Sequence, residues 1–512
     1  MVATIETVAF EGIEARRVEV QVLIASGLPT FTIVGLPDKA VTEARERVRA
    51  ALSALGLSLP PKRITVNLSP ADRPKEGSHY DLPIAVAVLV AMGVIPSDSL
   101  ANTVVMGELG LDGTIRAVSG VLPAAIYANA CDMAFVCPAE TGPEAAWAGA
   151  DTVMAPASLL GLMNHLKGSQ VLSPPEPALA ENNQAMLDLA DVKGQETAKR
   201  ALEIAAAGGH TMLMLGPPGS GKSMLAARMP SILPPLSAQE ALEISMIASV
   251  AGHLSEGAIS KVRPVRTPHH SASQPALIGG GARANPGEVS LAHNGVLFLD
   301  ELPEFSRSCL EALRQPMETG EAVIARAQAH ITYPARFQLV AAMNPCKCGY
   351  LADAERACNR APLCGADYQA KISGPLYDRV DLFVEVPALP ARELTSAGTG
   401  ESSSVIAERV AAARQIQSDR FEALGAASDI RVNAHANGKL LDKLAVLDGP
   451  AQDVMTRAAA TYKLSARGYH RVLKVARTIA DLAGADQIGQ KHIAEALTYR
   501  RVDVRQNLRQ VG

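Results

Sequence analysis

The chain has 512 residues, too many for a single hydrophobic core, and its length indicates roughly two to four domains. Hydrophobic residues make up 48% and charged residues 20%, the balance of a folded protein, while 4% aromatic residues are too few for base-stacking platforms. The net charge of −4 argues against a protein that coats nucleic acid over its whole surface. The charge is uneven, however, because residues 430–512 hold fourteen Lys or Arg against seven Asp or Glu. This basic segment fits either a local contact with a polyanion or a solvated helical face.

No export signal or membrane contact is expected. The first residues lack a basic stretch followed by a long apolar run, so they do not resemble a signal peptide. The longest apolar run, residues 84–95, is bounded by Pro83 and Pro96 and is too short to span a bilayer. It is interpreted as a core helix. Seven cysteines without an export signal predict reduced thiols and a cytoplasmic location.

In chain order, the pattern predicts an α/β protein of three folded segments. Residues 1–168 alternate strand-like and helical runs, and a proline-rich polar stretch predicts a linker over residues 169–186. A nucleotide domain is expected over residues 187–390, followed by a helical domain over residues 391–512. In the first segment, strands are expected over residues 18–24, 63–68 and 104–106, and helices over residues 39–55 and 82–92.

A phosphate-binding loop is predicted between an apolar strand, residues 211–215, and a helix, residues 223–228. The string GPPGSGKS fits G-x-x-x-x-G-K-[ST], in which backbone N–H groups surround the phosphates of a nucleotide. We expect Lys222 to reach the β- and γ-phosphates and the Ser223 hydroxyl to bind Mg²⁺. The residues expected to hold the nucleotide are Gly216, Pro217, Pro218, Gly219, Ser220, Gly221, Lys222, Ser223 and Met224.

Polar residues at the ends of two further apolar strands predict hydrolysis. Asp300 ends a run of four apolar residues, where its carboxylate can hold Mg²⁺. Glu301 is expected to act as the general base that polarises the attacking water. Asn344 follows the apolar run of residues 337–343 and is expected to lie beside the γ-phosphate. Arg379 is a candidate arginine finger for a neighbouring subunit's nucleotide, and the alternative is a salt bridge to Asp378 or Asp381.

Together these strings resemble the AAA+ ATPases of the magnesium-chelatase clade. More narrowly, TPHHSAS at residues 267–273, GGG at 279–281, LAHNGVLFLDELPE at 291–304 and LSARGYHR at 464–471 resemble the bacterial YifB/ComM family. The resemblance covers nearly the whole chain. It implies an AAA+ P-loop αβα core, a helical C-terminal lid, a homo-hexameric ring, and ATP and Mg²⁺ as cofactors. It also implies that Arg379 is the finger, that Arg467 is the nucleotide-sensing arginine of the lid, and that Val192 and Gln195 lie at the adenine edge.

In that clade two insertions line the pore of the ring. Here they correspond to residues 276–287, which contain Arg283, and to residues 321–334, which contain Arg326 and His330. The resemblance implies that these residues contact a DNA backbone. Without it, both segments would be interpreted as surface hairpins.

Four cysteines follow the strand that ends at Asn344: Cys346, Cys348, Cys358 and Cys364, spaced C-x-C-x₉-C-x₅-C. Four thiolates suit a closed tetrahedral zinc site that stabilises a loop, although knuckles spaced C-x₂-C are the usual form. The family resemblance favours zinc, and the alternative is four reduced thiols on a loop. The adjacent His269 and His270 are interpreted as loop structure.

The first segment resembles the proteolytic domain of Lon in the strings KEGSHYDLP, residues 75–83, and MGELGLDGTIR, residues 106–116. Lon uses a Ser–Lys dyad, but no lysine occurs here between Lys75 and Lys167. A serine without its base is not activated, so we expect a non-proteolytic domain that binds or caps. Ser78, His79 and Asp81 are too close in sequence to converge as a triad.

The resemblance implies an ATP-driven DNA motor that remodels recombination intermediates by branch migration and helicase action, as in natural transformation. Its partners would then be branched or single-stranded DNA and the recombinase machinery. One alternative is a chelatase-type chaperone subunit that drives metal insertion into a tetrapyrrole. Another is the regulator of an ATP-dependent protease.

Overall fold

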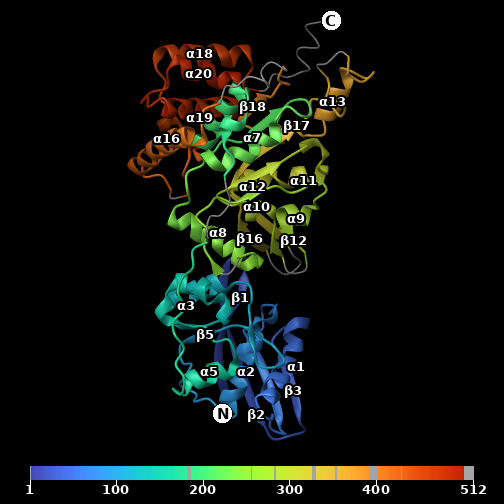
Figure 1. Cartoon of the computed structure of the whole chain (residues 1–512), viewed down its shortest axis with the longest axis vertical. Helices are drawn as coiled ribbons and strands as arrows, with labels where there is room; N and C mark the ends of the chain where they lie inside the picture. Colours follow the sequence, from blue (N-terminus) through green and yellow to red (C-terminus); the bar gives the residue numbers. More distant parts are fainter. Residues whose placement is uncertain are drawn as a thin grey trace.

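The computed structural model describes residues 2–180, 186–254, 257–281, 284–325, 330–351, 355–390, 400–427 and 429–500. The chain is elongated and consists of two stacked α/β units and one helical unit (Figure 1). The unit that contains the amino terminus lies at one end. A unit built on a five-stranded sheet lies in the middle, and the carboxyl-terminal helices lie at the other end.

The amino-terminal unit contains a mixed seven-stranded sheet in the order β3-β4-β2-β1-β5-β8-β9. The three strands expected from the sequence form β2, β4 and β5. β1 was not predicted; it pairs antiparallel with β2 and parallel with β5. The strands are β1 (Val2–Glu11), β2 (Glu14–Ala25), β3 (Thr30–Val34), β4 (Arg63–Ser69), β5 (Thr103–Val105), β8 (Ala134–Val136) and β9 (Val153–Met154), with a small hairpin of β6 (Glu108–Leu109) and β7 (Ile115–Arg116).

Helices cover both faces of this sheet because its side chains alternate between the faces. Val105 and Val136 pack with one helical layer, while the adjacent Val104 and Phe135 pack with α3 on the other side. The apolar run expected as a core helix forms α2, which is buried along almost its whole length. The helices are α1 (Lys39–Ala54), α2 (Asp81–Ala91), α3 (Val121–Ala130), α4 (Gly142–Ala145) and α5 (Leu159–Leu166).

The middle unit is built on a parallel sheet in the order β11-β14-β17-β10-β18. These strands are short, apolar and covered on both faces, as expected of a parallel sheet. The strands are β10 (Met212–Leu215), β11 (Val265–Arg266), β14 (Val296–Leu299), β17 (Gln338–Met343) and β18 (Leu382–Glu385). Because all strands run the same way, the residues that follow them meet at one edge of the sheet.

Helices and two hairpins surround the parallel sheet. One hairpin joins β12 (Gly279–Gly280) to β13 (Asn285–Pro286), and the other joins β15 (Glu321–Ala325) to β16 (His330–Pro334). The helices are α6 (Glu196–Gly208), α7 (Lys222–Arg228), α8 (Ala238–Ala251), α9 (Gln274–Ile278), α10 (Glu288–Leu291), α11 (Arg307–Ala312), α12 (Arg314–Thr319), α13 (Leu363–Gln369) and α14 (Gly374–Tyr377).

The carboxyl-terminal helices share a hydrophobic core with the middle unit. Val410 of α16 and Ile479 of α19 belong to the same buried cluster as Leu202 of α6 and Met212 of β10. A buried polar contact reinforces this packing, since His210 Nε2 lies 2.8 Å from Thr478 Oγ1. The helices are α16 (Ser403–Ala423), α17 (Gly438–Leu444), α18 (Gly449–Thr461), α19 (Ala466–Leu482) and α20 (Gln490–Thr498).

A partly buried ion pair also ties α8 to the carboxyl-terminal unit. Glu243 accepts hydrogen bonds from Arg431 at 3.0 Å and from Asn294 at 2.8 Å, and it lies 3.3 Å from His293 Nε2. The hydrogen bond with His293, followed by those with Arg431 and Asn294, lowers the pKa of the Glu243 carboxyl from 4.5 to about 2. Because its pKa is lowered on folding, this carboxylate stabilises the fold above about pH 4.5, and the stabilisation is lost as the pH falls toward 2.

We therefore expect Glu243→Gln to destabilise the protein by about 1–2 kcal/mol at pH 7, a figure reduced for the screening of a partly exposed carboxylate. The difference in melting temperature between wild type and variant should shrink as the pH is lowered from 5 to about 2. Glu408→Gln, an exposed position on α16, serves as the control and should match wild type. A difference that does not change with pH would contradict the ionic origin of this stabilisation.

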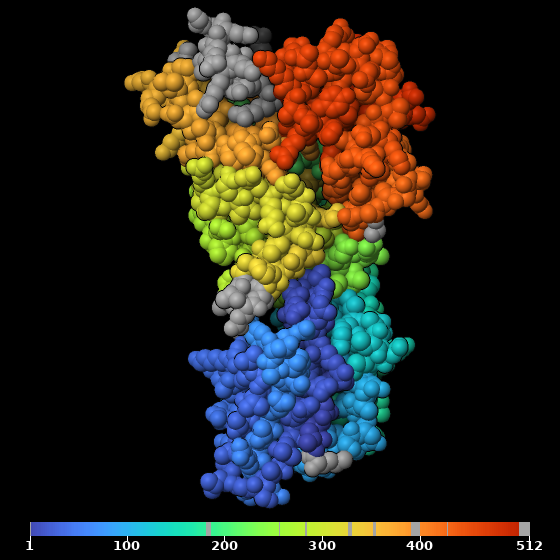
Figure 2. Space-filling model, turned by 180° about the vertical axis from the view of Figure 1, so that it is seen from behind, coloured from blue at the N-terminus to red at the C-terminus, as the bar shows by residue number. Residues whose placement is uncertain are grey.

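The amino-terminal unit contacts the middle unit through its β1–β2 turn and through α3. At the turn between β1 and β2, a Cβ on Gly12 would lie 2.6 Å from the Thr332 carbonyl oxygen of β16, so the two backbones are in direct contact. Figure 2 shows this dark-blue hairpin reaching the yellow strands of the middle unit. At the second place Leu122 of α3 packs in a cluster with Ala241 of α8, and the Gly120 N–H donates to the Ser249 carbonyl at 3.0 Å. The amino-terminal unit therefore packs directly against the hairpin β15–β16.

Among the described residues, no helix has the length and apolar character needed to cross a membrane.

Candidate active site

The predicted phosphate-binding loop lies between β10 and α7, at the carboxyl edge of the parallel sheet. Gly219 and Gly221 have φ angles of +76° and +94°, which residues with a side chain rarely adopt. Gly216 permits a close approach, since a Cβ there would lie 2.1 Å from the Val386 carbonyl oxygen. The loop therefore needs glycine at these three positions for its backbone to curve around a ligand.

The side chain of Lys222 is buried inside this loop. Its ammonium donates to the carbonyl oxygens of Gly216 and Pro217, both at 2.8 Å, and to Asn344 Oδ1 at 3.3 Å. Burial lowers the pKa of this ammonium. The structure thus brings Lys222 and Asn344, 122 positions apart, to one point. A cation held there by uncharged oxygens is suited to exchange one of them for a phosphate oxygen.

A pair of oxygen ligands lies next to the loop. Ser223 Oγ donates to Asp300 Oδ2 at 2.7 Å, and Asp300 directly follows β14. A hydroxyl and a carboxylate are ligands that Mg²⁺ accepts alongside nucleotide phosphates and water. The donor set therefore fits the Mg²⁺ that the sequence predicts.

Glu301 is held in an unusual backbone conformation. Its φ of +51° lies in the left-handed region, which costs a residue other than glycine of the order of 1–3 kcal/mol and is often found at functional sites. Its carboxylate lies 3.4 Å from His270 Nδ1. The sequence pattern predicts only loop structure for His270, and His270 does lie on the loop after β11. Because β11 and β14 are neighbours in the sheet, the residues that follow the two strands lie at the same edge. The order of the strands therefore explains the contact between His270 and Glu301.

These side chains line an open cavity of about 420 Å³. It is bounded by Ser223, Thr267, His269, His270, Asp300 and Glu301 among others.

The residues expected at the adenine edge lie beside the loop. Gln195 Nε2 donates to the Pro387 carbonyl at 2.7 Å and to the Ser220 carbonyl at 3.2 Å, so its amide connects β18 to the phosphate-binding loop. Val192 is buried in the shared core, whereas Met224 is half-exposed one residue beyond Ser223.

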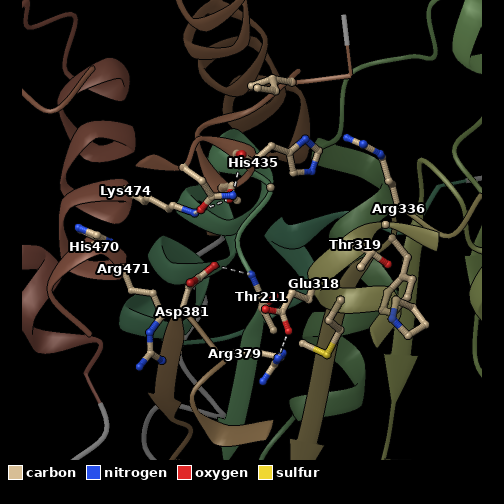
Figure 3. A pocket seen from close by; sticks show the side chains of 18 of the residues that line it. Thr211, Glu318, Thr319, Arg336, Arg379, Asp381, His435, His470, Arg471 and Lys474 are labelled. Carbon is tan, nitrogen blue, oxygen red and sulfur yellow. Dashed lines mark hydrogen bonds and ion pairs between the residues drawn. The ribbon is translucent and has the colours of Figure 1, made fainter. Parts of the chain in front are cut away.

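Arg379 and Arg467 lie at the opposite edge of the same sheet. They line a second cavity of about 540 Å³ together with Thr211, which precedes β10, whereas the phosphate-binding loop follows β10. Four strand residues at 3.3 Å each separate the two edges by about 13 Å. Arg379 forms an ion pair with Glu318 and donates to the Pro375 carbonyl at 2.9 Å (Figure 3). Neither arginine is therefore near the Lys222 of its own chain.

This second cavity is strongly charged. Arg471 donates to the Val380 carbonyl at 2.5 Å and lies 3.6 Å from Asp378, so it fixes the turn that carries Arg379. Lys474 donates to the Ala434 carbonyl at 2.8 Å, and Figure 3 shows it on the same side as Arg471. The basic side chains that line the cavity are Arg336, Arg379, Arg467, Arg471 and Lys474.

Sequence comparisons identify the family to which the chain belongs. Three family models match in chain order: "Subunit ChlI of Mg-chelatase" over residues 18–141, "Magnesium chelatase, subunit ChlI" over residues 188–394, and "Magnesium chelatase, subunit ChlI C-terminal" over residues 400–500. The chain is 44% identical to Competence protein ComM of Haemophilus influenzae over 495 residues, covering 96% of this chain and 95% of that protein. The chain belongs to the YifB/ComM family of magnesium-chelatase-like AAA+ proteins.

Two further relatives place the YifB/ComM chain in a wider group. YifB of Escherichia coli is 42% identical over 500 residues, covering 98% of this chain and 97% of that protein. The magnesium-chelatase 38 kDa subunit of Rhodobacter capsulatus is 26% identical over 324 residues, covering 60% of this chain and 84% of that subunit. The AAA+ family implies ATP and Mg²⁺ as ligands, in agreement with the donors described above.

Three of the four cysteines predicted to bind metal lie close together in the segment that follows β17. The sulfur atoms of Cys346, Cys348 and Cys364 all lie within 4.8 Å of one another, and Cys346 Sγ lies 3.1 Å from Cys348 Sγ. Cys358, the fourth predicted ligand, contacts the side chains of Cys348 and Cys364 but does not belong to this compact group of three. Hydrogen bonds from the Tyr350 backbone and from Cys346 lower the pKa of Cys348 to about 6. Burial shifts the pKa of the Cys346 and Cys364 thiols in the opposite direction and raises it. The proximity of three sulfur atoms is therefore what suits the group to an ion that prefers thiolate ligands.

The hairpin residues expected to contact DNA are only partly placed. His330 begins β16 and is exposed, beside a cavity lined by Glu11, Glu14 and Glu321. Arg283 and Arg326 lie outside the described residues.

The side chains of the amino-terminal unit that suggested protease chemistry have separate partners. His79 Nε2 lies 2.9 Å from the Val8 carbonyl oxygen, and burial lowers the pKa of His79 to about 4. Asp81 is paired with Arg47 at 2.6 Å, whereas Ser78 donates to Glu108. The Lys75 ammonium donates to backbone carbonyls, including that of Arg73 at 2.8 Å. Within the described residues, Ser78 forms no hydrogen bond with Lys75 or His79. The likeness to Lon remains an expectation from the sequence.

Proposed function

We propose that the chain is an ATP-hydrolysing DNA motor that works as a homo-hexameric ring and remodels branched recombination intermediates. The observation that carries the ring is the separation of Lys222, Asp300 and Glu301 from Arg379 and Arg467 at opposite edges of one sheet. A site with both parts forms when the arginine edge of one subunit faces the phosphate-binding loop of the next. Such head-to-tail contacts form a ring when the rotation between neighbouring subunits closes.

In this proposal each residue has a defined task. Lys222 binds the β- and γ-phosphates. Ser223 and Asp300 would hold Mg²⁺, which would supply positive charge next to the phosphates. Glu301 accepts a proton from the attacking water, and Asn344 orients that water. Arg379 stabilises the transferring phosphoryl group of the neighbouring subunit, and Arg467 binds the same nucleotide from the lid.

The three parts of the chain have separate roles in the proposal. Residues 187–390 form the AAA+ core and residues 391–512 the lid. Residues 1–168 form a non-proteolytic domain joined by the linker over residues 169–186. The turn between β1 and β2 contacts the hairpin β15–β16, which is one of the two hairpins that we assign to the pore. This contact favours a structural role for the amino-terminal domain, which would hold that hairpin in position.

DNA as the substrate is supported by two observations. The chain is 44% identical along nearly its whole length to a protein named for competence, and residues 430–512 carry a net charge of +7, with fourteen basic and seven acidic residues. A basic segment provides counterions for a phosphate backbone. In the proposal, Arg283, Arg326 and His330 contact that backbone within the pore.

The proposal predicts that DNA stimulates ATP hydrolysis by the purified full-length chain. We expect four-way and forked DNA to stimulate turnover more than linear duplex, and rising salt to weaken the effect. The same preparation is tested for metal insertion into a porphyrin, because the likeness to the 38 kDa chelatase subunit favours a chaperone role as the second candidate. Hydrolysis that is indifferent to every DNA, together with stimulated metal insertion, would favour that second function.

A further inference from the structure

The thiol cluster lies against the phosphate-binding loop, although the two are far apart in sequence. Gly349, one residue after Cys348, has a φ of +85°. A Cβ at this position would lie 2.6 Å from Pro218 Cδ and 3.0 Å from Pro218 Cγ. Backbone and ring are therefore in close contact, with no room for a methyl group between them.

The other end of the same turn also reaches the nucleotide site. Asn344, which accepts a hydrogen bond from Lys222, lies two residues before Cys346, and Cys346 is fully buried. The turn from Asn344 to Gly349 thus contacts the phosphate-binding loop at two points. Asn344 accepts a hydrogen bond from Lys222, and Gly349 packs against the ring of Pro218.

Helix α13 packs against this turn. Gln369 Nε2 donates to the Pro345 carbonyl at 3.2 Å, and the Gly365 backbone is so close that a Cβ there would lie 3.3 Å from the same oxygen. Cys364 lies on this helix. An ion bound by Cys364, Cys346 and Cys348 would connect α13 to the turn.

We propose that the four cysteines form a metal-dependent clamp, in which an ion bound by their thiolates holds the turn of residues 344–349 against the phosphate-binding loop and thereby sets nucleotide affinity. The inference rests on the proposed nucleotide site. The ion is one that prefers four thiolates, and Zn²⁺ fits best, because a closed set of four sulfur ligands is typical of its structural sites. Its effect reaches the nucleotide through Gly349 and Pro218 rather than through direct contact.

Two variants separate metal binding from its effect on the nucleotide site. Cys348→Ser removes a ligand, and it should lower both the zinc content and the affinity for nucleotide. Gly349→Ala keeps all four thiols but forces the turn away from Pro218, so it should retain the metal and weaken binding of a fluorescent ATP analogue about tenfold. The matched controls are Cys131→Ser, at an exposed cysteine, and Gly425→Ala, whose φ is +61° but whose Cβ would meet nothing within 4 Å.

The measurements are the zinc and iron content of the full-length protein by elemental mass spectrometry, and the dissociation constant of the analogue with Mg²⁺. The expected result is one zinc ion per chain in wild type, in Gly349→Ala and in both controls, with weakened nucleotide binding only in Gly349→Ala and Cys348→Ser. Wild type without bound metal, or Gly349→Ala with wild-type affinity, would overturn the clamp. Failure of wild type itself to bind the analogue would instead refute the proposed nucleotide site. If Cys348→Ser does not fold, the Gly349→Ala result still decides.

Discussion

Replacing Glu301 by Gln is expected to lower ATP turnover by about 10²- to 10⁴-fold, the usual contribution of a general base. The amide keeps the size of the side chain but cannot accept the proton of the attacking water. Binding of ATP should be nearly unchanged, because the proposal assigns the phosphates to the loop that encloses Lys222, and Glu301 is not part of that loop. Turnover is measured by phosphate release and binding by a fluorescent ATP analogue.

Glu422→Gln, at an exposed position on α16, is the control and should hydrolyse ATP as wild type does. Near-normal turnover by Glu301→Gln would show that another group activates the water. His270 would then be the first residue to examine, because its Nδ1 lies 3.4 Å from the Glu301 carboxylate.

Replacing Arg379 by Ala is expected to lower turnover by about 10³- to 10⁵-fold, the range seen for arginine fingers. The reason is positional: Arg379 lies at the amino edge of β10 and so faces away from the nucleotide of its own chain. Turnover is again measured by phosphate release. Arg457→Ala, an exposed arginine on α18 that does not line the cavity, is the control and should retain activity.

Mixing two inactive variants tests the shared site. The Lys222→Ala variant keeps Arg379, and the Arg379→Ala variant keeps an intact phosphate-binding loop. A complete site therefore forms wherever the loop of an Arg379→Ala subunit faces the arginine edge of a Lys222→Ala subunit. In rings assembled at random from equal amounts, about a quarter of the contacts regain both parts, and that share of activity should return. A mixture as inactive as its components would place the whole site within one subunit.

The local parts of the site could be predicted from the sequence because their signals are contiguous. The glycine-rich loop, the apolar strand before Asp300 and the strand before Asn344 each combine a motif with its own structural context, and the structure places Lys222 and Asn344 in contact. The core helix α2 was likewise visible as an uninterrupted apolar run between prolines. By contrast, β1 escaped prediction because its polar and charged residues interrupt the apolar pattern of the strand.

Other features depend on packing between distant elements, which no local pattern encodes. The placement of Arg467 beside Arg379 follows from the way α19 packs against α6 and β10. The contact of His270 with Glu301 depends on β11 and β14 being neighbours in the sheet. The contact of Gly349 with Pro218 joins two loops 131 positions apart, where neither sequence suggests the other.

The most direct test of the proposed DNA motor is to follow a fluorescently labelled, mobile four-way junction with the full-length protein, Mg²⁺ and ATP. We predict that wild type converts the junction to duplex or forked products, and that Glu301→Gln and Arg379→Ala bind ATP but leave the junction intact. Wild type that hydrolyses ATP while the junction persists, at low salt and with excess protein, would contradict the proposal that this ring acts on DNA.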